Sequence, residues 1–209
     1  MQKIFPDCRR SDIGPHYIVE ALAGFLEPVR PDHPDHGCSA CGRVNYTKPV
    51  ISAIEGMALG GGFELAMNSD IIVCGEGAEL GLPEARIVLM PGGGTQNLPR
   101  LIGAPPAKEL MWTGQRIPAA EAKGYRLCNH VVPKGQAMEK ARDIVGQIAK
   151  NSQLSVMLVK QAVNRGIDMS LANGVGTEAD LFRLLTFSDD REEGLKAFRE
   201  KRKLNFMGS

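Results

Sequence analysis

The sequence lacks an excess of charge of either sign, because 25 Lys and Arg residues are balanced by 24 Asp and Glu residues and the net charge is +1. Proteins that bind nucleic acid or an anionic membrane generally carry a basic patch, so this balance argues against both partners. The sequence also lacks an apolar run of the roughly 20 residues that a membrane-spanning helix needs. We therefore expect neither a nucleic-acid partner nor a membrane partner.

The first residues lack the apolar segment of a secretory signal, and Asp7 and Asp12 disfavour a transit peptide. We expect a soluble cytoplasmic protein, with the mitochondrial matrix as the alternative if the source is eukaryotic. The chain has an odd number of cysteines, spread over a long sequence, which favours reduced thiols over a disulfide framework. The five residues are Cys8, Cys38, Cys41, Cys74 and Cys128.

Residues 1–47 differ in texture from the rest of the chain. Residues 30–41 lack a hydrophobic period, and their two prolines break any helix or central strand there. This stretch has a Cys-x-x-Cys spacing and two histidines, which resembles a zinc ligand set. All four residues crowd into nine positions, however, and no second ligand cluster accompanies them. We expect no metal site and interpret the stretch as a thiol-bearing linker containing His33, His36, Cys38 and Cys41.

From Lys48 onward, near-continuous apolar stretches alternate with helix-like segments. Residues 49–54 and 70–74 predict buried strands, and residues 61–68 between them predict a short helix. Strands of this kind alternating with helices indicate an α/β core with both sheet faces covered. The following glycine-rich turn is expected to lead into a helix that Gly103 ends.

The remainder of the chain is predicted to be mostly helical. Apolar residues at helical spacing define one face over residues 138–148 and another over residues 154–165. Asp189 and Glu192 predict the start of the last helix, with Leu195 and Phe198 as its apolar contacts. Trp112, beside other apolar residues, is interpreted as core. The chain is thus divided into residues 1–47, a core at 48–133 and a helical region at 134–209.

The most informative feature joins a glycine turn to two acids. The run Ala58-Leu-Gly-Gly-Gly-Phe-Glu64 lies where a strand becomes a helix, so its amides can face an oxyanion. Glu84 follows in Gly81-Leu-Pro-Glu84, 20 positions after Glu64. Two acids around one water can serve as base and acid in its addition to an activated double bond. The simpler alternative is that the helix dipole alone favours a Glu in the first turn.

These motifs have a family resemblance that extends over residues 48–207. Six motifs carry it, in a specific order along the chain: Lys48 to Asp70, Gly81 to Glu84, Pro91 to Gln96, Leu110 to Gly114, Asn129 to Pro133 and Asp190 to Arg202. Together they resemble the enoyl-CoA hydratase/isomerase (crotonase) family. The resemblance implies a spiral ββα core and a helical C-terminal region that packs a trimer or hexamer.

The resemblance also implies the chemistry. The substrate would be an acyl-CoA, and the coenzyme A would be part of that substrate rather than a cofactor. Glu64 and Glu84 match the two catalytic acids of the family's hydratases, Gly61 matches an oxyanion-hole amide, and no metal is implied. Gly92 matches a residue that helps to hold the water, although the glycine turn around it is one residue shorter than usual.

The family's N-terminal strands have no clear match, so the N-terminal part of the fold is expected to be incomplete. The family's motif for the second oxyanion amide has only a partial match here, Ser11-Asp-Ile13, so Ser11 is the candidate for this donor. We therefore expect an enoyl-CoA hydratase-like lyase, possessing both acids but with impaired activity. Two alternatives stay open: a weak or inactive subunit that acts in assembly, and a family isomerase or thioester hydrolase.

Overall fold

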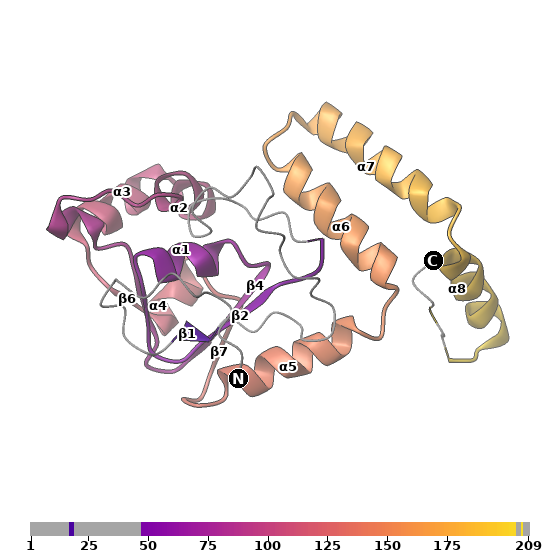
Figure 1. Cartoon of the computed structure of the whole chain (residues 1–209), viewed down its shortest axis with the longest axis horizontal. Helices are drawn as coiled ribbons and strands as arrows, with labels where there is room; N and C mark the ends of the chain where they lie inside the picture. The colour runs from indigo at the N-terminus through magenta and orange to yellow at the C-terminus, as the bar shows by residue number, and fades with distance from the viewer. Residues whose placement is uncertain (1–16, 19–46, 204–205, 207–209) are drawn as a thin grey trace, which may run out of the picture.

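The computed structural model describes residues 17–18, 47–203 and 206. Within this part, two small sheets and their covering helices form one body, and three further helices extend from it (Figure 1). The alternation of strands and helices confirms the predicted α/β class with a helical C-terminal region. Ser11 and the four His and Cys residues of the 33–41 stretch lie outside the described residues.

The first sheet has the strand order β1-β2-β4-β7. β2, β4 and β7 run parallel, and β1 pairs antiparallel with β2 at the edge. The strands expected at 49–54 and 70–74 are present, each starting slightly later than predicted. The bounds are Tyr17–Ile18 for β1, Ile51–Ile54 for β2, Ile71–Gly75 for β4 and His130–Val132 for β7.

The second sheet has the order β3-β5-β6, with β3 parallel to β5 and β6 antiparallel at the edge. β2 of the first sheet leads directly to β3, and β4 leads to β5. The chain thus crosses twice from the first sheet to the second, each time between consecutive strands, which confirms the spiral ββα core. The bounds are Met57–Leu59 for β3, Glu79–Gly81 for β5 and Ile117–Pro118 for β6.

Helices cover the two sheets and enclose the main hydrophobic core. Phe63, Leu80, Leu82 and Leu98 are fully buried at its centre. As predicted, Gly103 ends the helix that follows the glycine-rich turn, with φ at 88°. The elements on this side are α1 (Gly61–Met67), the 3-10 helix η1 (Glu84–Ile87), α2 (Gly94–Ile102), α3 (Ala104–Thr113) and α4 (Ala119–Gly124).

Helix α5 (Ala137–Ile148) packs against the opposite face of the first sheet, as Figure 1 shows. Its predicted apolar face is confirmed, because Ala141 is buried against the sheet with Met138, Val145 and Ile148 beside it. The helix belongs to the predicted third segment but shares a core with the second. The boundary between residues 133 and 134 therefore stays a prediction.

The last three helices are α6 (Gln153–Gly166), α7 (Leu171–Thr186) and α8 (Asp189–Glu200). α6 and α7 lie side by side (Figure 1). The N-cap of α8 is Ser188, one residue before the predicted capping pair, and its hydroxyl accepts the Arg191 N–H. The acids Asp189 and Glu192 instead occupy its first turn, where the helix dipole favours negative charge.

Three apolar side chains were predicted to be buried and are not. Trp112 is 74% exposed on α3, because that helix buries Ala107, Leu110 and Met111 instead. On α8, Leu195 and Phe198 face outward, and Phe198 is 84% exposed. Spacing alone identified helices here but assigned the wrong face to the core.

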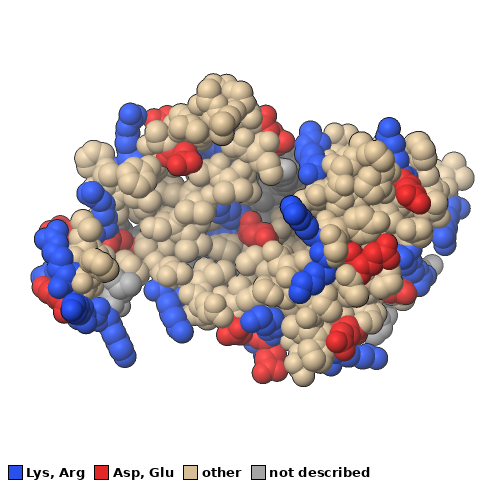
Figure 2. Space-filling model, turned by 180° about the vertical axis from the view of Figure 1, so that it is seen from behind, with Lys and Arg blue, Asp and Glu red and all other residues tan. Residues whose placement is uncertain are grey.

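Among the described residues, no helix is long and apolar enough to cross a membrane. The face of the molecule in Figure 2 carries Lys and Arg side chains interspersed with Asp and Glu, separated by uncharged surface. This distribution agrees with the balanced composition of the sequence.

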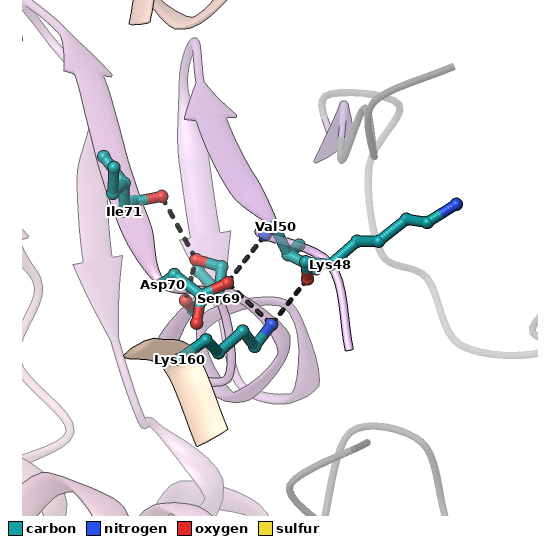
Figure 3. A network of polar contacts seen from close by, with 7 residues as sticks. Lys48, Val50, Ser69, Asp70, Ile71 and Lys160 are labelled. Atoms are coloured by element: carbon teal, nitrogen blue, oxygen red, sulfur yellow. Dashed lines mark hydrogen bonds and ion pairs between the residues drawn. The ribbon is translucent and has the colours of Figure 1, made fainter. Parts of the chain in front are cut away.

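A polar network ties α6 to the residues that precede β2 and β4 in the first sheet (Figure 3). Lys160 Nζ donates to Asp70 Oδ2 and to the Lys48 carbonyl, each at 2.7 Å. The same Asp70 oxygen accepts the Val50 N–H at 2.6 Å. The Lys160 side chain is only 10% exposed, so water replaces these contacts poorly. The network therefore joins the C-terminal helices to the core.

Replacing Lys160 by Met should lower the free energy of unfolding by about 1.5–3 kcal/mol, because it removes hydrogen bonds to a partly buried carboxylate. The measurement is urea denaturation followed by circular dichroism. Lys140→Met is the matched control, since Lys140 forms a more exposed pair with Asp143 on a single helix. Equal stability of the Lys160 variant and the wild type would show that the network contributes nothing.

Candidate active site

The glycine turn between β3 and α1 has a backbone shape that only glycine adopts without strain. Gly60 has φ 56° and ψ −131°, and its N–H donates to the Gly81 carbonyl at 2.9 Å. This bond fixes the turn beside β5. Gly61 follows as the first residue of α1, where a backbone N–H has no acceptor within its own helix. The predicted oxyanion donor is thus at a helix start.

Glu64 lies in the first turn of α1 and is 4% exposed. Its Oε1 accepts the N–H groups of Gly93 and Gly94 at 2.8 and 2.7 Å. These amides belong to the N-terminal end of α2, whose positive dipole end suits a carboxylate. A buried acid is therefore held in a defined orientation by backbone donors from a segment about 30 residues away.

The second of these donors requires glycine. A Cβ on Gly94 would lie 2.6 Å from Leu82 Cδ1 and 2.9 Å from Pro91 Cβ. Any side chain at this position would push the N-terminal end of α2 away from Glu64. Packing around residue 94 therefore supports the orientation of the carboxylate.

Glu84 opens η1 and faces the glycine turn. Its Oε1 lies 3.3 Å from where a Cβ on Gly60 would be. Its Oε2 is buried, and no described residue hydrogen-bonds to it. Burial raises the pKa of the Glu84 carboxyl, the nearby charge of Glu64 raises it further, and the backbone amide of Glu84 partly offsets both. The neutral form is thereby favoured relative to an exposed glutamate.

The structure thus places Gly61, Glu64 and Glu84 around one glycine turn, as expected from the sequence. Gly92 lies in the turn before α2 but is exposed, and the neighbouring Gly93 and Gly94 amides are those that contact Glu64. These two donors were not predicted from the sequence. The signal was present, because the Pro91-Gly-Gly-Gly-Thr95 turn leads into a predicted helix and so presents its first amides.

The remaining candidates lie elsewhere. Cys74 and Cys128 are buried in the main core, as predicted, and a hydrogen bond between their side chains together with burial raises the pKa of the Cys74 thiol. His130 is half-buried on β7. The described part of the chain has no group of three His, Cys, Asp or Glu side chains that could hold a metal ion.

Comparison with known proteins places this chain in a family. The family model for enoyl-CoA hydratase/isomerase matches residues 43–209. The chain therefore belongs to the enoyl-CoA hydratase/isomerase family.

Two curated relatives illustrate the match. The crotonyl-CoA hydratase of Syntrophomonas wolfei is 44% identical over 161 residues, which cover 77% of this chain and 62% of the relative. The mitochondrial enoyl-CoA hydratase of Pongo abelii is 44% identical over 160 residues, which cover 76% of this chain and 55% of the relative. The chain thus spans less than two thirds of the length of these relatives.

Solved structures share the fold. A crystal structure of enoyl-CoA hydratase from Bacillus anthracis matches with a TM-score of 0.77 and 45% identity, and the match covers 79% of this chain and 64% of that chain. Another, from Geobacillus kaustophilus, matches with a TM-score of 0.75 and 43% identity, covering 78% of this chain and 64% of that chain.

Proposed function

We propose that this chain is an enoyl-CoA hydratase-like lyase, which adds water across the 2,3 double bond of an enoyl-CoA thioester. The supporting observation is the convergence of two acids with different surroundings on one glycine turn. Glu64 accepts two backbone N–H groups, whereas Glu84 has a buried oxygen with no partner among the described residues. Such a pair suits one base and one acid. The names of the similar hydratases support the same reaction.

In the proposed mechanism, the carboxylate of Glu64 takes a proton from water as the water oxygen bonds to C3. The electron pair of the double bond moves onto the thioester, and the Gly61 N–H stabilises the resulting enolate oxygen. The neutral carboxyl of Glu84, favoured by its raised pKa, then protonates C2. A proton returning from Glu64 to Glu84 through solvent restores both groups.

This mechanism needs no separate cofactor. The thioester carbonyl accepts the electron pair, so the coenzyme A portion of the substrate provides the activation. The chain supplies orientation, one oxyanion donor and two proton-transfer groups. The proposed setting is acyl-CoA metabolism such as fatty-acid β-oxidation, in the cytoplasm or, in a eukaryote, the mitochondrial matrix.

The test is a comparison of three activities on purified protein. Short and medium 2-enoyl-CoA thioesters report hydration through loss of the conjugated absorbance, 3-enoyl-CoA thioesters report isomerisation, and released thiol reports hydrolysis. Hydration as the fastest of the three supports the proposal. Isomerisation or hydrolysis as the fastest would assign the site to another reaction of the family, and absence of all three would favour an assembly subunit.

We also propose that the chain forms a homo-trimer or hexamer through its C-terminal helices. Phe187 between α7 and α8 is 88% exposed, and Leu171 and Phe198 are 84% exposed. Large apolar side chains exposed along neighbouring helices are typical of an interface. Analytical ultracentrifugation should give a mass of three or six chains, and replacing Phe187 and Phe198 by Ser should lower it. A monomeric wild-type protein would contradict the proposal.

A further inference from the structure

The segment that carries Glu84 packs against the C-terminal end of α3. Gly114 ends that helix with φ 59° and ψ 26°. A Cβ on Gly114 would lie 2.8 Å from Arg86 Nε and 3.2 Å from Pro83 Cα. The backbone of Gly114 therefore fits against the residues on both sides of Glu84. A side chain at position 114 would displace the Pro83 backbone as well as the Arg86 side chain.

Arg86 makes a second connection to the same helix end. Its Nη2 donates to the Thr113 carbonyl at 3.2 Å. The last carbonyls of a helix have no donor within the helix, and a cation there also interacts favourably with the dipole. Arg86 itself is exposed, so burial of its side chain does not explain its position. Its contact with α3 instead links η1 to a neighbouring element.

Within η1, two backbone hydrogen bonds to the Glu84 carbonyl close the turn. The Glu84 carbonyl accepts the N–H of Val88, which adopts a left-handed conformation with φ 61°, and the N–H of Leu89 at 3.0 Å. A short turn closed in this way moves as a unit. Any shift of the turn relative to α3 therefore also moves the Glu84 carboxyl relative to Gly60.

We propose that Gly114 and Arg86 are positioning residues for Glu84, through which the C-terminal end of α3 sets where the carboxyl lies against the glycine turn. The consequence for catalysis rests on the proposed function. Displacing a reacting group by about 1 Å can cost roughly 10²-fold in rate, so small shifts of η1 matter. Neither residue touches the reacting atoms.

The pKa of Glu84 offers a second readout. It would not change if Gly114 and Arg86 only stabilised the fold. Glu64 of α1 is the charged group whose field acts on Glu84, whereas Thr113 and Gly114 of α3 have no titratable side chain. Arg86, on the same turn, points to α3. If η1 loosens, water reaches the carboxyl and its burial decreases. Its raised pKa should then fall back toward the ordinary value for glutamate.

The experiment compares Arg86→Met, Arg86→Lys and Gly114→Ala with the wild type. In the hydration assay, Arg86→Met should lower kcat about tenfold with KM within about twofold, and Gly114→Ala should lower it further. Arg86→Lys should recover part of the loss. Arg191→Met is the matched control, because Arg191 donates to the Thr186 carbonyl at the end of α7, away from Glu84. It should behave as the wild type.

A second readout does not depend on turnover. In ¹³C-glutamate-labelled protein, the Glu84 carboxyl is assigned by its loss in Glu84→Gln and titrated by NMR. A lower pKa in Arg86→Met, with no change in Arg191→Met, supports the proposal even if the wild type lacks hydration activity, in which case only the proposed function fails. An unchanged Glu84 titration and an unchanged kcat in folded Arg86→Met would overturn the proposal, whether or not Gly114→Ala folds.

Discussion

Replacing Glu64 or Glu84 by glutamine is expected to slow hydration of a 2-enoyl-CoA by about 10²–10⁴-fold, the contribution typical of one general acid or base. Each replacement keeps the shape of the side chain but removes proton transfer. Thioester binding should change little, so the loss should appear in kcat rather than in KM. Steady-state kinetics with a short enoyl-CoA, together with calorimetric binding of the hydrated product, separates the two effects.

The control for this pair is Glu76→Gln, because Glu76 is an exposed acid that follows β4. Its turnover should equal that of the wild type. Near-normal turnover in Glu64→Gln or Glu84→Gln would remove that residue from the mechanism.

Loss of activity in Glu84→Gln should not reflect unfolding. Because the pKa of Glu84 is raised in the folded protein, its contribution to stability is present below the ordinary glutamate pKa and is lost as pH rises through the folded value. Glutamine does not ionise, so it avoids this loss. At neutral pH the variant should therefore be at least as stable as the wild type in thermal denaturation.

The second large effect is expected for Gly61→Pro, which deletes the proposed oxyanion donor. Losing one such donor typically costs about 10²–10³ in kcat. Proline is well tolerated at the first position of a helix, where Gly61 lies, so the fold should survive. The measurement is kcat with a short enoyl-CoA on protein whose circular dichroism matches the wild type.

Gly61→Ala provides the comparison, because it adds a methyl group but keeps the N–H. Gly61 is not among the glycines with positive φ, so alanine suits its backbone. The proline variant should be far slower than the alanine variant. Equal rates in the two would show that the Gly61 amide is not the donor.

The α/β class and the position of the glycine turn could be predicted because their signals are local in sequence. Runs of apolar residues identified β2 and β4, and the glycine run before Glu64 located the turn. The partners of these residues could not be predicted, because they depend on how distant segments pack. Glu55 shows this, since its carboxylate accepts the Gly135 and Ala137 N–H groups at 2.9 and 2.7 Å and so fixes the start of α5.

The same limit applies to which side of a helix is buried. Trp112 lies beside apolar residues at helical spacing, but the orientation of α3 is set by its packing on the core. Likewise, the Gly93 and Gly94 amides could not be assigned to Glu64 from the sequence, because tertiary packing brings them to that carboxylate. The role of Gly92 in holding the water stays a prediction. Spacing predicts the element, and packing decides which of its atoms face the site.

The most direct test of Glu84 as the acid that works beside Glu64 is the pH dependence of kcat/KM for hydration. In the wild type, kcat/KM should fall as the pH rises through the raised pKa of Glu84, because activity requires the protonated form of this acid. The residual activity of Glu84→Gln should lose this alkaline limb, whereas the residual activity of Glu64→Gln should keep it. An alkaline limb that persists unchanged in Glu84→Gln would contradict the account.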